Sequence, residues 1–153
     1  MAHVYAVRAV LPGMLERGGG TLIHTASMAG ILMSNGNLPY TVSKHAVVGL
    51  AEYLSVTHHH QGIRVSLLAP LGVRTPMLGD TDRPFARNAT GPIKEPEEVA
   101  EMVSTAVEEE RFLILTDDIA QTWMEGKTGD IERWLRGMRR LAEKIESEGG
   151  RDL

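Results

Sequence analysis

Residues 37–70 read "NLPYTVSKHAVVGLAEYLSVTHHHQGIRVSLLAP", and this stretch decides the fold class. From Pro39 to about His59 the apolar residues recur every three or four positions, which predicts an amphipathic helix. The segment "GIRVSLLAP" at 62–70 is almost continuously apolar, as in a strand that is buried on both faces. A helix that leads directly into such a strand is typical of βαβ units and therefore of a parallel sheet.

Similar elements lie on both sides of this stretch. The runs "TLIHTAS" at 21–27 and "RFLILT" at 111–116 predict two more strands. Helical periodicity predicts helices over 1–17, 97–109 and 130–146. Between the second strand and the helix at 97, a proline-rich stretch predicts a long loop with one short helix. We therefore expect one α/β domain over 1–153, a three-layer Rossmann-type parallel sheet of about three strands with flanking helices.

Composition excludes several classes of protein. The 153 residues carry a net charge of −4, which gives no basis for binding nucleic acid. The chain has no cysteine, so it can form neither disulfides nor thiolate metal sites, and this fits a reducing cytoplasm. No run approaches the roughly 20 apolar residues of a membrane span. His58, His59 and His60 are consecutive and cannot face one another on a helix, so we expect a solvated helix end and no metal site.

The chemistry of the chain concentrates at the expected strand ends, where open α/β sheets bind their ligands. Tyr40 and Lys44 are four residues apart and therefore share one face of the helix. The ordinary pKa of a tyrosine is about 10, and a neighbouring ammonium favours its phenolate. Ser27, which closes the first strand, can hydrogen-bond the oxygen that the tyrosine protonates or deprotonates. The alternative is that Tyr40 and Lys44 are an ordinary pair of side chains on a helix surface, with no catalytic role.

Three stretches together resemble the short-chain dehydrogenase/reductase family. They are "HTASMAG", the Y-x-x-x-K of Tyr40 and Lys44 thirteen residues after Ser27, and "GIRVSLLAPLGVRTPM". A bare Y-x-x-x-K is a weak motif, but its combination with the serine and the strand-plus-proline segment is specific. The tail is also similar to C-terminal segments of that family, so the resemblance covers almost the whole chain.

The resemblance implies an NAD(P)-dependent oxidoreductase that interconverts an alcohol and a ketone or aldehyde. It implies Tyr40 as general acid/base, Lys44 as the group that lowers the tyrosine pKa and binds the cofactor ribose, and Ser27 as the residue that orients the substrate oxygen. The segment with Pro70, Leu71, Val73 and Thr75 would contact the nicotinamide, with Leu71 at a position where glycine is usual. Residues 76–95 would form a substrate lid, and the expected substrate contacts are Ser27, Met28, Met77 and Leu78.

Two features of the family are missing from this chain. The glycines at 18–20 lead into a strand, and no glycine-rich turn leads out of a strand into a helix. Counting back from "RAVLP", the catalytic asparagine of the family would fall about two positions before Met1. We therefore expect the C-terminal half of such an enzyme, without the N-terminal dinucleotide-binding half and starting just after the catalytic asparagine, and weak binding of NAD or NADP by this chain alone.

A second function remains open from sequence. The chain could be an inactive remnant or a protein-interaction module that keeps the motif by descent, in which case its bare strand edge would serve assembly. The resemblance also implies a homo-oligomer formed through the helices at 1–17 and 39–59. A coding stretch upstream of Met1 with a glycine-rich turn would distinguish a truncated enzyme from such a module.

Overall fold

A computed structural model describes residues 1–149 of the chain. The central element is a three-stranded parallel sheet in the order β1-β2-β5, which consists of β1 (Gly20–Thr25), β2 (Ile63–Ala69) and β5 (Leu113–Leu115). The register pairs Gly20 with Ile63 and Leu67 with Leu113. The expected fold class is confirmed, because all three strands are parallel and are separated by helices.

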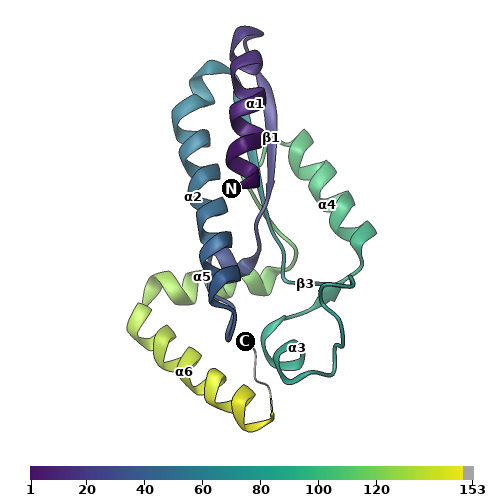
Figure 1. Cartoon of the computed structure of the whole chain (residues 1–153), viewed down its shortest axis with the longest axis vertical. Helices are drawn as coiled ribbons and strands as arrows, with labels where there is room; N and C mark the ends of the chain where they lie inside the picture. The colour runs from purple at the N-terminus through teal and green to yellow at the C-terminus, as the bar shows by residue number, and fades with distance from the viewer. Residues whose placement is uncertain (150–153) are drawn as a thin grey trace.

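The sheet is covered on both faces, which gives the three layers (Figure 1). On one face lie α1 (Ala2–Glu16) and α2 (Leu38–His58), and on the other lies α4 (Pro96–Glu108). The first core cluster joins α1 and α2 to β1 and β2, and its buried residues are Val7, Leu22, Ala26, Ala51, Leu54, Ile63, Val65 and Leu67. The second joins α4 to β2 and β5 through Leu68, Val99, Ala106 and Ile114. Strand β2 contacts both layers, which explains its almost continuous apolar sequence.

The remaining elements lie beyond the carboxyl ends of the strands. They are η1 (Met28–Gly30), β3 (Gly72–Val73), α3 (Pro84–Ala89), β4 (Ile93–Lys94), α5 (Asp118–Gly129) and α6 (Ile131–Ser147); a further turn, η2 (His59–Gln61), connects α2 to β2. The long loop does contain one short helix, α3, as expected. The sequence did not reveal α5 or the two-stranded parallel pairing of β3 with β4. A third core cluster of Met28, Ala69 and Ala120 holds α5 against the sheet end.

One glycine is required by close packing where the chain enters β2. Gly62 has a φ of +84°, and a Cβ at this position would lie 2.2 Å from the carbonyl oxygen of Gly18. Only glycine allows the backbone before β1 and the backbone before β2 to approach this closely. This contact helps to fix the register of the two strands, whose carboxyl ends lead to Ser27 and Pro70.

The outer edge of β1 has no partner strand within residues 1–149, where β1 pairs only with β2. Ile23 on this strand is 48% exposed, although its neighbours Leu22 and His24 are buried.

None of the helices described over 1–149 is both long and apolar enough to cross a membrane.

Candidate functional site

Ser27 lies two residues after the end of β1 and is the N-cap of η1. Its backbone is extended, with a φ of −178°, and its Oγ accepts a hydrogen bond of 3.1 Å from the backbone N–H of Ala29. The hydroxyl thus caps η1 as an acceptor. A serine hydroxyl has one donor proton and two lone pairs, so the donor remains available to an oxygen outside the chain. The site therefore presents one oriented O–H donor at the carboxyl end of β1.

Tyr40 lies in the first turn of α2. The Oδ1 of Asn37 caps this helix by accepting the backbone N–H of Tyr40 at 3.1 Å, and Pro39 occupies the first turn, where its missing N–H has no cost. The cap fixes the point at which the helix begins and therefore the direction of the Tyr40 side chain. The phenol is half-buried.

Lys44 connects this helix to the sheet. Its Nζ donates to the carbonyl oxygen of Thr25 at 3.1 Å and lies 5.5 Å from the centre of the Tyr40 ring. Burial lowers the pKa of Lys44. The ammonium is thus held between the phenol and the last residue of β1, two residues before Ser27. Lys44 therefore contacts the end of β1 as well as the tyrosine on its own helix.

Close packing of η1 on α2 brings Ser27 toward the helix of Tyr40 and Lys44. A Cβ on Gly30, at the end of η1, would lie 2.5 Å from the carbonyl oxygen of Lys44 and 3.0 Å from Cγ2 of Val48. The two backbones are therefore in direct contact. The three residues that the sequence singles out for catalysis lie on neighbouring elements at one end of the sheet.

The segment after β2 joins the same region through backbone hydrogen bonds. The carbonyl oxygen of Pro70 accepts the N–H of Met28 at 3.0 Å, and the N–H of Leu71 donates to Oγ1 of Thr116 at 3.1 Å. The Leu71 side chain packs against the cluster of Met28, Ala69 and Ala120. The side chain that replaces the glycine expected from the resemblance is therefore half-buried against this cluster.

The other residues expected to bind cofactor or substrate are in different environments. Val73 is half-buried in β3 and packs against the second core cluster, whereas Thr75 is exposed. Met28 is buried, with 4% of its surface exposed, but Met77 is 83% exposed. Leu78 is half-buried, and its carbonyl oxygen accepts a hydrogen bond of 2.6 Å from Nη2 of Arg83. Met28 and Met77 are thus at opposite extremes of burial.

The segment 76–95 is anchored at both its base and its middle. At the base, Arg74 forms an ion pair of 2.6 Å with Glu95, beside the pairing of β3 with β4. In the middle, the amide of Asn88 bonds to Glu148 at 3.0 Å and to Nζ of Lys144 at 2.7 Å. Helix α3 is thereby attached to α6, an arrangement that the sequence alone did not reveal.

A pair of histidines lies beside this site. Nδ1 of His3 on α1 is 3.1 Å from Nδ1 of His24 on β1, and His24 is only 3% exposed. Burial lowers the pKa of both imidazoles, and the charge of Lys44 further lowers the pKa of His3. The two Nδ1 atoms share one proton, since one must donate and the other accept. Nothing in the sequence indicated that His24 would meet a partner 21 residues away.

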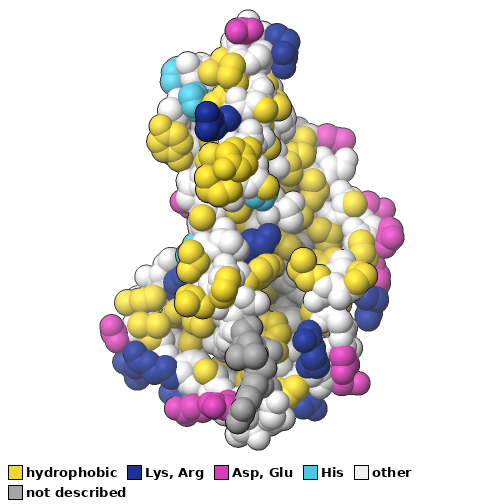
Figure 2. Space-filling view, viewed as in Figure 1, with side chains coloured by type: hydrophobic (Ala, Val, Ile, Leu, Met, Phe, Trp, Pro, Cys, Tyr) yellow, Lys and Arg dark blue, Asp and Glu magenta, His cyan; other side chains and the backbone are white. Residues whose placement is uncertain are grey.

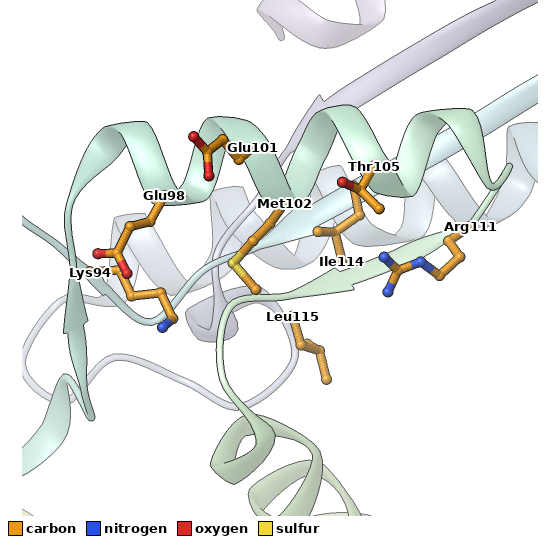
Figure 3. Close-up of a pocket in the computed structure, with 8 residues that line it drawn as sticks. All are labelled: Lys94, Glu98, Glu101, Met102, Thr105, Arg111, Ile114 and Leu115. Carbon is orange, nitrogen blue, oxygen red and sulfur yellow. The ribbon is translucent and has the colours of Figure 1, made fainter.

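One pocket lies apart from these residues. It lies between α4 and β5 (Figure 3), and its lining side chains include Lys94, Arg111, Glu98 and Glu101. Of the residues that the sequence analysis singled out, only Lys94, at the end of the expected lid segment 76–95, lines this pocket, and the mixed charges favour neither cations nor anions. Over residues 1–149, no three His, Asp or Glu side chains are grouped to hold a metal ion.

Comparison with known proteins gives consistent matches. Residues 1–84, more than half of the chain, match the short chain dehydrogenase family. The chain is 37% identical over 134 residues to a 1-deoxy-11-beta-hydroxypentalenate dehydrogenase of Streptomyces exfoliatus, covering 86% of this chain and 48% of the relative. It is 30% identical to a cyclohexanol dehydrogenase of an Acinetobacter species, covering 67% of this chain and 42% of that relative.

Among solved structures, the chain is similar to a short chain dehydrogenase/reductase from Burkholderia phymatum in complex with NAD. The TM-score is 0.69 at 29% sequence identity, and the match covers 84% of this chain and 54% of the other. The chain thus spans about half the length of the relatives it matches.

Proposed function

Because this chain belongs to the short-chain dehydrogenase/reductase family, we propose that it forms the catalytic and substrate-binding half of an NAD(P)-dependent oxidoreductase. The reaction would interconvert an alcohol and a ketone or aldehyde. One observation carries the proposal: Lys44 lies between the phenol of Tyr40 and the end of β1, next to Ser27. If both side chains were simply solvated on the helix surface, we would not expect Lys44 to bond the carbonyl oxygen of Thr25.

Each residue has a defined part in the proposed reaction. Tyr40 accepts the proton of the substrate hydroxyl during oxidation and returns it during reduction. The Ser27 hydroxyl donates to the substrate oxygen and holds it near the phenol. The Lys44 ammonium stabilises negative charge on the phenol oxygen, and its partial burial strengthens that interaction. A bound nicotinamide supplies or accepts the hydride.

The residues present fit the nicotinamide end of such a cofactor better than its phosphate end. Lys44 and the backbone of Pro70, Leu71, Val73 and Thr75 lie at the carboxyl ends of the strands, where open sheets bind dinucleotides. No strand of residues 1–149 leads through a glycine-rich turn into a helix, so the phosphates have no cradle in this part. We propose NAD or NADP as cofactor, with weak binding to this chain alone.

The proposed substrate is a small apolar alcohol or carbonyl compound, and residues 76–95 form its lid. Support comes from the fixed base and middle of this segment, which leave its residues between Thr75 and Arg83 as the part that can adapt. Met77, Leu78 and Met28 are the apolar contacts proposed for the substrate. The exposed Met77 would be covered only when the lid closes over a ligand.

We also propose that a second copy binds to α1 and α2. On α2, the exposed residues Val42, Ala46, Gly49, Tyr53 and Val56 follow one another at intervals of three and four, so they form one stripe without a charge. Tyr5 and Val10 of α1 are also exposed, and Figure 2 shows apolar side chains on the surface of the part of the molecule that contains these helices. The small Ala46 and Gly49 would let a partner helix approach closely.

This stripe predicts a dimer that a single charge disrupts. Gly49→Glu places a carboxylate in the middle of the stripe, where a Cβ meets no atom within 4 Å of the same chain. We expect sedimentation velocity to show a dimer for the wild-type chain and a monomer for the variant, with unchanged helix content. A wild-type chain that sediments as a monomer at every concentration measured would contradict the proposal.

The test of the proposed function is a titration of the chain with NADH and with NADPH, followed by nicotinamide fluorescence. A micromolar dinucleotide site has a binding free energy of about −8 kcal/mol, and half of it corresponds to a Kd in the millimolar range. We expect saturable binding in that range, competed by the oxidised cofactor. Lys44→Met should weaken it by about tenfold or more, whereas Arg139→Met, at an exposed position of α6, should not.

Absence of saturable binding to a folded sample would count against the cofactor site in this chain. The same result in a protein that also carries the N-terminal half found in the relatives would overturn the proposed function. An interaction module that keeps the motif by descent would then be the remaining explanation.

A further inference from the structure

Lys127, near the end of α5, is a charged side chain that the proposed mechanism does not use. Its Nζ donates to the carbonyl oxygens of Ile31 and of Leu32, the latter at 3.2 Å. The same ammonium lies 5.1 Å from the centre of the Trp134 ring on α6. One cation therefore connects α5, α6 and a segment almost a hundred residues earlier in the chain.

The surroundings of this ammonium are unusual because they carry no negative charge. Within residues 1–149, no carboxylate oxygen lies within 4.0 Å of Lys127, since none of the ion pairs there includes it. Burial alone lowers the pKa of Lys127. Two carbonyl dipoles and one aromatic face hold the charge, and hydrogen bonds from a charged donor are stronger than those between neutral groups. Loss of the charge should therefore release the carbonyls.

The segment 31–37 that Lys127 holds connects Ser27 to Tyr40. On its first side, the N–H groups of Ile31 and Leu32 donate to the carbonyl oxygen of Met28, in the turn that Ser27 caps. On its second side, Asn37 caps the helix at Tyr40. These bonds join residues three or four positions apart, whereas Lys127 contacts the first two residues of the segment from the C-terminal helices.

A second anchor holds the later part of segment 31–37, and it does not involve Lys127. The N–H of Ser34 donates to Oγ1 of Thr41 at 3.0 Å, and that hydroxyl donates to the carbonyl oxygen of Ser34 at 3.3 Å. This anchor attaches the later part of the segment to α2. The turn at Ile31 and Leu32 contacts α5 in two ways: its carbonyl oxygens accept hydrogen bonds from Lys127, and its side chains pack against the cluster that contains Ala120.

We propose that Lys127 is a positioning residue, whose ammonium clamps segment 31–37 onto α5 and α6 and so maintains the spacing between Ser27 and Tyr40. This proposal rests on the proposed function for its consequence in catalysis, but the clamp itself can be measured without cofactor or substrate. It also makes the C-terminal helices part of the site, because movement of α5 is transmitted directly to the turn after Ser27.

Two substitutions separate charge from packing. Lys127→Met keeps an unbranched apolar stem against Trp134 but removes the charge and the donors. Lys127→Arg keeps the charge, can donate to two carbonyl oxygens and can stack on an indole. Lys94→Met is the control, because Lys94 lies in β4 and lines the pocket between α4 and β5.

The first measurement is hydrogen exchange of peptides that cover 31–37, corrected for intrinsic rates, in the full chain without ligand. We expect Lys127→Met to speed exchange there by about tenfold or more, Lys127→Arg to remain within about threefold of wild type, and Lys94→Met to have no effect. Urea unfolding of each variant identifies a general loss of stability, which would speed exchange in β1 and β2 as well. Unchanged exchange at 31–37 in Lys127→Met overturns the clamp.

The second measurement is turnover in a protein that carries this chain together with the N-terminal half found in its relatives. Misplacement of reacting groups by about 1 Å can cost 10²-fold in rate. We expect Lys127→Met to lower kcat by at least tenfold with little change in the KM for the cofactor, and Lys127→Arg to restore most of it. An unchanged kcat despite faster exchange overturns the positioning role. If the wild-type protein shows no turnover, the proposed function fails, while the exchange result still decides whether the clamp exists.

Discussion

Tyr40→Phe is expected to abolish most of the turnover while leaving the fold intact. The substitution removes only the phenol oxygen, and the contact of the Lys44 ammonium with the ring and with Thr25 remains. Loss of a general acid/base costs roughly 10²–10⁴-fold in rate. The assay is formation of NADH or NADPH from a simple alcohol such as cyclohexanol, in a protein that carries this chain together with the N-terminal half of its relatives.

Tyr53→Phe is the matched control for this experiment. Tyr53 lies on the same helix, thirteen residues after Tyr40, and is 64% exposed within the stripe that is proposed to face a second copy. Its loss of a phenol oxygen should leave turnover within about twofold of wild type, since surface substitutions rarely exceed ±0.5 kcal/mol. Turnover by Tyr40→Phe at the wild-type rate would exclude Tyr40 as the acid/base and remove the central element of the proposed mechanism.

Gly30→Ala is expected to disturb both stability and the site. The added Cβ would lie 2.5 Å from the carbonyl oxygen and 2.7 Å from the carbonyl carbon of Lys44, and both are backbone atoms that cannot rotate away. η1 must therefore move away from α2, which carries Ser27 away from Tyr40. Overpacking of this kind costs about 1–3 kcal/mol of unfolding free energy. In the extended protein, a shift of about 1 Å should lower kcat by up to 10²-fold.

The same substitution at Gly49 should have the opposite effect on stability. Gly49 is in the interior of α2, and a Cβ there meets no atom within 4 Å. In the monomeric chain, alanine at this position should stabilise the helix by about 0.5–1 kcal/mol. Urea unfolding of both variants of the chain provides the comparison. If Gly30→Ala is as stable as wild type, the close contact between η1 and α2 does not exist in solution.

The strands and most helices could be predicted because their signals are local. Apolar runs gave β1, β2 and β5, and helical periodicity gave α1, α2, α4 and α6, with ends that differ from the structure by only a few residues. Helix α5 was missed because "DIAQTWMEGKTG" has two glycines and little apolar periodicity. It is stabilised instead by the cap from Asp117 and by the packing of Ala120 against Met28 and Ala69. β3 and β4 have two residues each, too few to give a pattern.

The sequence by itself determined the α/β class, the three strands and the pairing of Tyr40 with Lys44, because a spacing of four on a helix is a local property of the backbone. Only the tertiary structure decided what these side chains meet. Lys44 bonds Thr25 nineteen residues earlier, His3 meets His24 from another layer, and Lys127 reaches Ile31 across 96 residues. Such contacts depend on how the layers pack around the sheet, and no periodicity in the sequence records them.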